Sequence, residues 1–263
     1  MSVVCGLILA ALGAMPAAAA EAPACAGPVE ISRAHVVRAE RNGVLVLSDG
    51  RALILEGIRL PLGAADHAPA RLADEARATL LSLTDEAPLS GRAVPPKEDR
   101  YDRVRVQGFA SPNSSDSKWL QQALLEQGLA RVAIAPDRSE CAAELFGFEA
   151  AARKAGLGLW AQSAYRIRTD RDDWHPDLGT FQLIEGKLTR ITARDGDMVL
   201  DFGGDGRNGL LAVISGADRR NFRSPDLDGL AGRRLRLRGI VQESNGRPMI
   251  ALSNPEQIEL LDR

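Results

Sequence analysis

The sequence predicts a mixed α+β chain, mainly β, in which two small β-barrels follow one another and the first also carries three helices. Two observations predict this architecture. Short β-like runs separated by Gly, Asn, Asp or Pro occupy both ends of the chain, whereas apolar residues recur with a helical period in its middle. The length of 263 residues is typical of two domains of ordinary size.

The composition is that of a folded chain. Hydrophobic residues make up 45% of it and charged residues 26%, which excludes a disordered or disulfide-dense polypeptide. The formal net charge of −2 argues against a strongly basic nucleic-acid coat protein, and leaves room only for a local basic patch.

Residues 1–22 have the features of an export signal. Residues 1–20 contain no charged side chain, and Ala18 and Ala20 are the small residues that a signal peptidase accepts. The alternative is an uncleaved anchor, because about 18 apolar residues can just span a bilayer. We expect cleavage, and therefore an exported protein, periplasmic or extracellular, without membrane attachment afterwards.

The cysteines are consistent with export. Removal of the signal leaves Cys25 and Cys141, an even number in an oxidising compartment. We expect a disulfide between them, with two separate thiols as the alternative. In the chain-entropy model a loop of this length would stabilise the fold by about 4–5 kcal/mol.

Residues 29–162 are expected to form the first unit, with elements in the order βββαββαα. Three β-like runs come first, ISRAHVVRAE, VLVLSDG and RALILEGIRL, and they are separated by Asn-Gly and Asp-Gly, the strongest hairpin signals. Two further strands are expected near residues 91–94 and 103–110. Five strands with an inserted helix are what a Greek-key barrel of the OB type needs, although other α+β folds share this composition.

Three helices are expected in the same unit. Apolar residues between 72 and 83 fall on one face of the first helix. The second helix is expected to begin near the Ser/Asp cluster at 114–117 and to end at Gly128, and the third to begin at a Ser139 cap and to end at Gly156.

The second unit is expected over residues 181–263, after a polar, irregular linker at 163–180. Its β-rich runs are short and are not interrupted by helices of comparable length, so a second OB-like β-barrel is predicted. Asp195, Asp197 and Asp201 cluster here, and we interpret them as a hairpin turn rather than a calcium loop.

The stretch GRRLRLRGIV in this second unit is rich in arginine. If it is a strand, Leu235 and Leu237 point inward, while Arg234, Arg236 and Arg238 form a row on the other face. On an OB barrel such a row could contact phosphates. The alternative is a solvated strand whose arginines pair with neighbouring Asp and Glu.

Four stretches occur in the first unit in a characteristic order: LSDGRALILEGIRL, DRYDRVRV, LQQALLEQGLARVA and ECAAELFGFEAAARKAGLGLW. Through them, residues from about 31 to 162 resemble the staphylococcal-nuclease (thermonuclease-like) family. The resemblance implies an OB barrel with helices. It also implies phosphodiester cleavage by a bound Ca²⁺, with carboxylates that hold the metal and activate water and two arginines that neutralise the transition state.

The arginines of that site are retained more clearly than its carboxylates. Arg59 and Arg103 match the family's two arginines, and Tyr101 matches the tyrosine of its Y-G-R stretch. Tyr101 and its neighbour Arg100 are therefore candidates for nucleic-acid contacts. Each of these residues also has a purely structural explanation, such as an ion pair between Arg59 and Glu56.

The metal ligands and the general base do not match. The family's DGDT loop is Asp-Gly-Arg-Ala here, so Arg51 stands in place of an aspartate. In the register that retains Arg59, the second aspartate falls on Ala64 and the glutamate on His67. The resemblance therefore predicts no metal and no cofactor.

The leading interpretation is an exported thermonuclease-like protein that has lost its calcium-binding and general-base carboxylates, and that serves in binding or in structure. Its expected partners are single-stranded nucleic acid or another anionic polymer, or a protein. The alternative is an active nuclease or phosphodiesterase with an altered site built on Arg59, Arg103, Tyr101 and His67, because imidazole titrates near neutrality and could act as a base. A third interpretation is a purely structural envelope component.

Overall fold

The computed structural model describes residues 22–85, 87–113, 116–170, 172–203, 209–222 and 227–261. The expected export signal lies outside these residues, apart from Ala22. No helix in the described part of the chain is long and apolar enough to cross a membrane.

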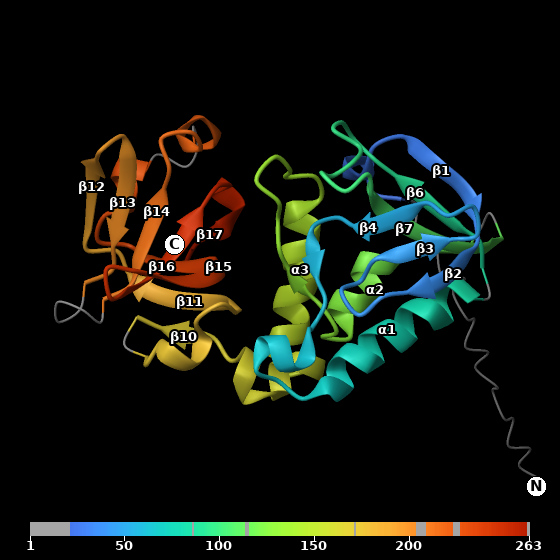
Figure 1. The fold of residues 1–263 in the computed structure, drawn as a ribbon, viewed down its shortest axis with the longest axis horizontal. Helices are drawn as coiled ribbons and strands as arrows, with labels where there is room; N and C mark the ends of the chain where they lie inside the picture. Colours follow the sequence, from blue (N-terminus) through green and yellow to red (C-terminus); the bar gives the residue numbers. More distant parts are fainter. Residues whose placement is uncertain are drawn as a thin grey trace, which may run out of the picture.

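Two strand-rich units lie side by side (Figure 1). The sheet of the first unit has the order β1-β6-β7-β4-β3-β2, and β8 pairs with β7. A separate pair is formed by β5 (Ile58–Arg59) and β9 (Arg131–Val132). The other strands of this unit are β1 (Val29–Ala34), β2 (Val36–Ala39), β3 (Leu45–Leu47), β4 (Ala52–Leu55), β6 (Leu89–Arg92), β7 (Val104–Asn113) and β8 (Asp116–Trp119).

Three helices belong to the first unit: α1 (Ala70–Asp85), α2 (Leu120–Glu126) and α3 (Ala142–Lys154). The predicted face of α1 is confirmed, since Leu72, Ala76 and Leu80 are all buried. Helix α1 contacts β2, and α2 contacts β7 and α3. Figure 1 shows α3 on the side of this unit that faces the second unit, which gives α3 a role at the boundary.

The second unit has a sheet in the order β10-β11-β15-β16-β14-β13-β12, and β17 pairs with β15. Its strands are β10 (Arg168–Thr169), β11 (Phe181–Lys187), β12 (Arg190–Arg194), β13 (Asp197–Asp201), β14 (Leu211–Ile214), β15 (Arg234–Ser244), β16 (Arg247–Leu252) and β17 (Ile258–Leu260). Each unit encloses its own apolar core. The predicted mixed α+β architecture, with three helices and two strand-rich sheets, is confirmed.

Three local predictions are wrong. The run ISRAHVVRAE is two strands rather than one, because Arg33 takes a φ of +49° and the chain changes partner from β6 to β3. The second helix begins at Leu120 rather than at the Ser/Asp cluster, because Asp116–Trp119 pairs with β7 instead. Ser139 does not cap the third helix, whose N-cap is Cys141 and makes no side-chain cap bond.

Residues 163–180 are not a free tether. Strand β10 pairs in parallel with β11, and Trp174 is buried in the core of the second unit. The Arg168 guanidinium donates to both carboxylate oxygens of Asp177 at 2.7 Å. Arg166 and Asp172 form a second pair, so four of the charged residues that suggested a linker are paired with one another, and a large aromatic side chain anchors the segment.

Two predicted local features are confirmed. Asp195 and Gly196, with φ of +53° and +92°, form the turn between β12 and β13, as expected for a hairpin. Cys25 and Cys141 form a disulfide with their Cα atoms 5.1 Å apart. This bond ties the segment before β1 to the start of α3.

Candidate functional site

Two adjoining hollows lie on the first unit, and they share Arg103 in their walls. The first, which we call the interdomain cleft, has a volume of about 620 Å³ and is lined by both units. Its first-unit wall includes Val44, Ile54, Ile58, Arg59, Leu60, Leu62, Arg103, Ala133, Ala135 and Pro136, and its second-unit wall Phe181, Gly239, Ile240, Gln242, Ala251 and Gln257. The second, the loop groove, is lined by the charged residues Glu56, Glu98, Asp99, Arg100, Arg103, Arg105 and Asp137 together with Tyr101.

Arg103 lies at the start of β7, held by the loop before it. Its Nε and Nη2 donate to one carboxylate oxygen of Asp99 at 2.9 and 2.6 Å. Burial raises the pKa of Asp99, but hydrogen bonds from Arg103 and from the backbone N–H groups of Tyr101 and Arg103 outweigh this and lower it. Arg103 is therefore a paired cation with one terminal nitrogen, Nη1, left for another contact.

Tyr101 stands at the tip of the same loop and is 57% exposed. The guanidinium carbons of Arg100 and Arg103 lie 4.8 and 4.9 Å from its ring centroid. This arrangement leaves an aromatic side chain in solvent beside two cations. The role of Tyr101 and Arg100 in nucleic-acid contacts stays a prediction. The described structure brings these three residues together.

Arg105 joins two carboxylates across the loop groove. Its Nε donates to Glu56 at 2.7 Å, and its Nη1 donates to Asp137 at 2.9 Å. Burial raises the pKa of Asp137, but the hydrogen bond and charge of Arg105 more than offset this and lower it. Glu56 therefore pairs with Arg105, not with Arg59 as one sequence-based explanation had it.

Arg59 leaves β5 at the inner wall of the interdomain cleft, with 29% of its side chain exposed. Its nearest carboxylate is that of Asp66, at 3.9 Å. Asp66 is buried, accepts hydrogen bonds from the Tyr165 hydroxyl at 3.0 Å and from Arg131 at 3.3 Å, and thereby connects β9 to the segment that leads into the second unit.

His67 of the predicted altered site lies elsewhere, and so do Arg51 and Ala64, which stand at positions where the family has acidic residues. Arg51 forms a two-point ion pair with Asp49 in an exposed hairpin, at 2.9 and 2.7 Å. His67 is an exposed residue at the end of a short 3-10 helix, with its Nδ1 2.5 Å from the Pro176 carbonyl oxygen. Neither these two nor Ala64 lines the cleft or the groove. Arg59 and Arg103 share the cleft, whereas His67 does not join them.

The predicted arginine row is only partly exposed. Leu235 and Leu237 point into the core as expected, and Arg236 pairs with Glu185 and Glu259 at 2.6 and 2.8 Å. Arg238 is buried and pairs with Glu149 of α3. The prediction of an open row of three arginines is therefore wrong, because α3 covers the face of β15 at Arg238.

Two residues of this region were not singled out from the sequence: Arg131 and Glu149. Arg131 donates to the Phe181 carbonyl at 2.5 Å, and Glu149 accepts from Arg238 of β15 at 3.1 Å, so both lie at the contact between the units. The only available signal was a charged residue inside an otherwise apolar stretch, as in GLARVA.

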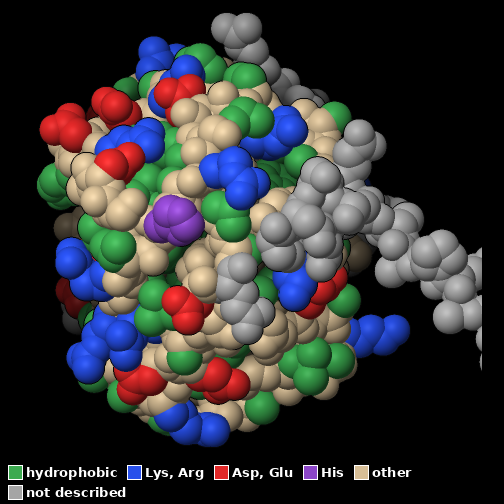
Figure 2. Space-filling model, turned by 90° about the vertical axis from the view of Figure 1, so that its right-hand side faces the viewer, with side chains coloured by type: hydrophobic (Ala, Val, Ile, Leu, Met, Phe, Trp, Pro, Cys, Tyr) green, Lys and Arg blue, Asp and Glu red, His purple; other side chains and the backbone are tan. Residues whose placement is uncertain are grey.

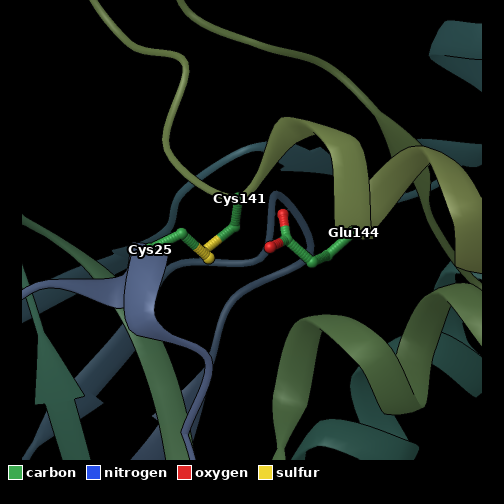
Figure 3. A group of neighbouring side chains, drawn as sticks. All are labelled: Cys25, Cys141 and Glu144. Carbon is green, nitrogen blue, oxygen red and sulfur yellow. A yellow bond between two sulfur atoms is a disulfide. The ribbon is translucent and has the colours of Figure 1, made fainter.

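Metal-binding side chains gather at one place in the described structure, where Cys25, Cys141 and Glu144 lie within 4.8 Å of one another (Figure 3). Both sulfur atoms are bonded to each other, so they offer no thiolate to a metal. Figure 2 shows the outer face of the first unit, where basic and acidic side chains are interspersed rather than gathered into one basic field.

Comparison with known proteins identifies the first unit. Residues 53–162 match the family model described as staphylococcal nuclease homologue. This part of the chain is a staphylococcal-nuclease-like domain, as the sequence resemblance implied. No curated protein matches the chain.

Proposed function

We propose that this protein is an exported member of the nuclease-like fold that binds its partners without cleaving them. The observation that carries this proposal is that four carboxylates in or near the two hollows are paired with arginines. Asp66, Asp99 and Asp137 each accept hydrogen bonds from an arginine side chain, and so does Glu56. A calcium ion takes six to eight oxygen ligands, and carboxylates already neutralised by guanidinium groups form a poor set of donors.

The family's R-L-x-G-I-D-x-P-E stretch can be aligned with this chain in two registers, and in both the acidic positions of the motif are occupied by non-acidic residues. The register that starts at Arg59 puts Ala64 and His67 at the acidic positions. A second register aligns Gly57, Ile58 and Pro61 with the G, I and P of the motif, and puts Arg59 and Leu62 at those positions.

The structure favours the second register. Gly57 has a φ of +85°, and a Cβ there would lie 2.6 Å from Leu145 Cδ1, so the site requires glycine. The family arginine then corresponds to Ile54, and Arg59 stands where a metal aspartate is expected. The residues present do not fit a calcium ion in either register, and we derive no metal-dependent step.

Incubation of the signal-free chain with single-stranded DNA and RNA, with and without Ca²⁺, tests this proposal. We expect no cleavage above that of an identically purified R59A/R103A variant. The matched variant separates activity of this protein from a contaminating nuclease. Calcium-dependent cleavage that disappears in R59A/R103A would show instead that the altered site is active.

A second candidate function is the binding of single-stranded nucleic acid at the loop groove, and exposed Tyr101 favours it. An aromatic ring flanked by arginines is a stacking platform for bases, worth about 1–3 kcal/mol per base. Fluorescence anisotropy with labelled oligothymidylate tests it: Tyr101→Ala should weaken binding at least about fivefold, and Arg71→Ala, on the exposed face of α1, should not. Equal affinity of Tyr101→Ala and the unchanged chain would contradict this function.

A further inference from the structure

An unusual pair of like charges borders the interdomain cleft. The antiparallel pairing of β5 and β9 sets Arg59 directly opposite Arg131. The guanidinium carbons of both lie over the ring of Phe181, at 5.8 and 5.1 Å from its centroid. Like charges placed opposite one another across a strand pair destabilise it, so a compensating negative charge is expected nearby.

Asp66 is the carboxylate that both cations share, and it accepts a hydrogen bond from only one of them. Its Oδ2 accepts hydrogen bonds from Arg131, Tyr165 and the Leu62 N–H, at 3.3, 3.0 and 2.8 Å. Arg59 Nη2 lies 3.9 Å from Oδ1, which is beyond hydrogen-bond distance. Even a direct bond between them would leave two guanidinium groups sharing one carboxylate.

The hydrogen-bonding capacity of Arg59 is unused. Arg59 donates no hydrogen bond to any residue that the structure describes, and its Nε is buried without a partner. Burial lowers the pKa of Arg131 to about 10, and the positive charge of Arg59 adds to this effect against the attraction of Asp66. The cluster therefore has one surplus positive charge at the wall of the cleft.

The arginines of the other cluster at the boundary are hydrogen-bonded to carboxylates. Arg238 pairs with Glu149 and Glu259, Arg236 with Glu185 and Glu259, and Arg153 with Glu149. Arg234 also lies 3.8 Å from Glu185, so charge alone does not distinguish this cluster from the cleft. The difference is that Arg59 donates no hydrogen bond to a carboxylate of any residue that the structure describes, whereas Arg153, Arg236 and Arg238 do.

The cleft next to Arg59 is built for an apolar molecule. Ile54, Ile58, Leu60, Leu62 and Ile240 line it, and its volume of about 620 Å³ lies within the range of small-molecule sites, about 300–1,000 Å³. Phe181 is the one aromatic residue among the described lining residues, and the guanidinium groups of Arg59 and Arg131 already lie over its ring. Stacking of a nucleobase is therefore not what these walls offer.

We propose that the interdomain cleft binds a small aliphatic carboxylate, with its carboxylate on Arg59 and its hydrocarbon chain along the aliphatic walls. A planar guanidinium can donate two parallel hydrogen bonds to a carboxylate. A single surplus charge matches a monoanion, whereas a phosphate monoester would bring close to two negative charges. This inference does not depend on whether the loop groove binds nucleic acid.

Isothermal titration calorimetry of the signal-free chain with octanoate at neutral pH tests the proposal. We expect saturable binding of octanoate, with octanol and adenosine monophosphate at least about tenfold weaker. Arg59→Gln should weaken octanoate binding at least about tenfold, because a charged hydrogen-bonded contact is lost. Arg71→Gln removes the same charge from the exposed face of α1 and should bind as the unchanged chain does.

Ile240→Glu provides a second test that keeps Arg59. Ile240 is 42% exposed and lines the cleft, so the variant is expected to fold, and its carboxylate would occupy the place of the ligand's. Octanoate binding should be lost, with the circular dichroism spectrum unchanged. The proposal is overturned if octanoate does not bind, binds no better than octanol, or binds Arg59→Gln and Ile240→Glu as tightly as the unchanged chain; preference for adenosine monophosphate would also overturn it.

Discussion

Arg238 of β15 and Glu149 of α3 form a doubly hydrogen-bonded ion pair, and each side chain is only 1% exposed. The two terminal nitrogens of Arg238 lie 3.3 and 3.1 Å from the two carboxylate oxygens, and Nη1 also donates to the Val132 carbonyl at 2.9 Å. The phenyl ring of Phe146 lies under the guanidinium at 4.4 Å. A buried cation of the second unit is thus held by a carboxylate, a carbonyl and an aromatic ring of the first unit, as well as by Glu259 of its own unit.

Removal of one partner of this pair should destabilise the whole chain. Arg238→Met leaves Glu149 buried opposite Arg153 alone, and breaking a buried pair in this way costs about 3–5 kcal/mol. Urea denaturation followed by circular dichroism measures the change. The R238M/E149L double variant should lose less stability than the sum of the two single changes, because the buried pair is removed as a whole and the partners it leaves, Arg153 and Glu259, are both partly exposed. A double variant that loses as much stability as that sum, or more, would contradict this account.

Stability should fall in acid through Glu259. Burial raises its pKa, but the charges of Arg238 and Arg236 and the hydrogen bond from Arg238 outweigh this and lower it below the ordinary 4.5. A carboxyl group with a lowered pKa in the folded state contributes stability that is complete above 4.5 and is lost as the pH falls through the folded-state pKa.

Measurement of the free energy of unfolding between about pH 6 and about pH 3 tests this contribution of Glu259. In Glu259→Gln the acid-dependent loss should be smaller, because the group that takes up the proton is gone. Asp195→Asn is a suitable comparison, since Asp195 is almost fully exposed and should leave the pH dependence as it is. A Glu259→Gln profile parallel to that of the unchanged chain would rule out this origin.

Reduction of the disulfide should lower stability substantially. Cys25 and Cys141 are 116 positions apart, and closing a loop of that length restricts the unfolded chain by about 4–5 kcal/mol in the entropy model. The C25S/C141S variant should show this loss in urea denaturation. Added reductant should have no further effect on it, whereas the unchanged chain should become less stable.

Gly57 and Gly50 form a matched pair for testing backbone strain. Both have positive φ, +85° and +88°, but a Cβ at Gly57 would meet Leu145 Cδ1 at 2.6 Å, whereas a Cβ at Gly50 meets nothing within 4 Å. Gly50→Ala should cost about 1 kcal/mol from the left-handed backbone alone, and Gly57→Ala clearly more. Thermal denaturation of both variants compares them directly, and equal losses would exclude the steric contribution at Gly57.

The sequence determined by itself those features that depend on neighbours along the chain. Apolar periodicity located α1, and β-like runs between turn residues located most of the longer strands, although not β8 or β10. Leu235 and Leu237 were placed in the core because side chains alternate along a strand. The cysteine count predicted the disulfide. The nuclease-like resemblance rested on linear motifs, and a family model matches residues 53–162, the greater part of that region.

The tertiary structure alone decided which faces are covered. The alternation that places Leu237 in the core also places Arg238 on the opposite face of β15. The sequence pattern did not indicate that α3 packs on this face and buries Arg238. The position of Arg59 opposite Arg131, and of both against Phe181, likewise depends on strand pairing and on contact between two units distant in sequence. Whether a charged side chain is buried depends on which elements pack against it. Those elements are brought together by long-range contacts and not by the local spacing of residues along the chain.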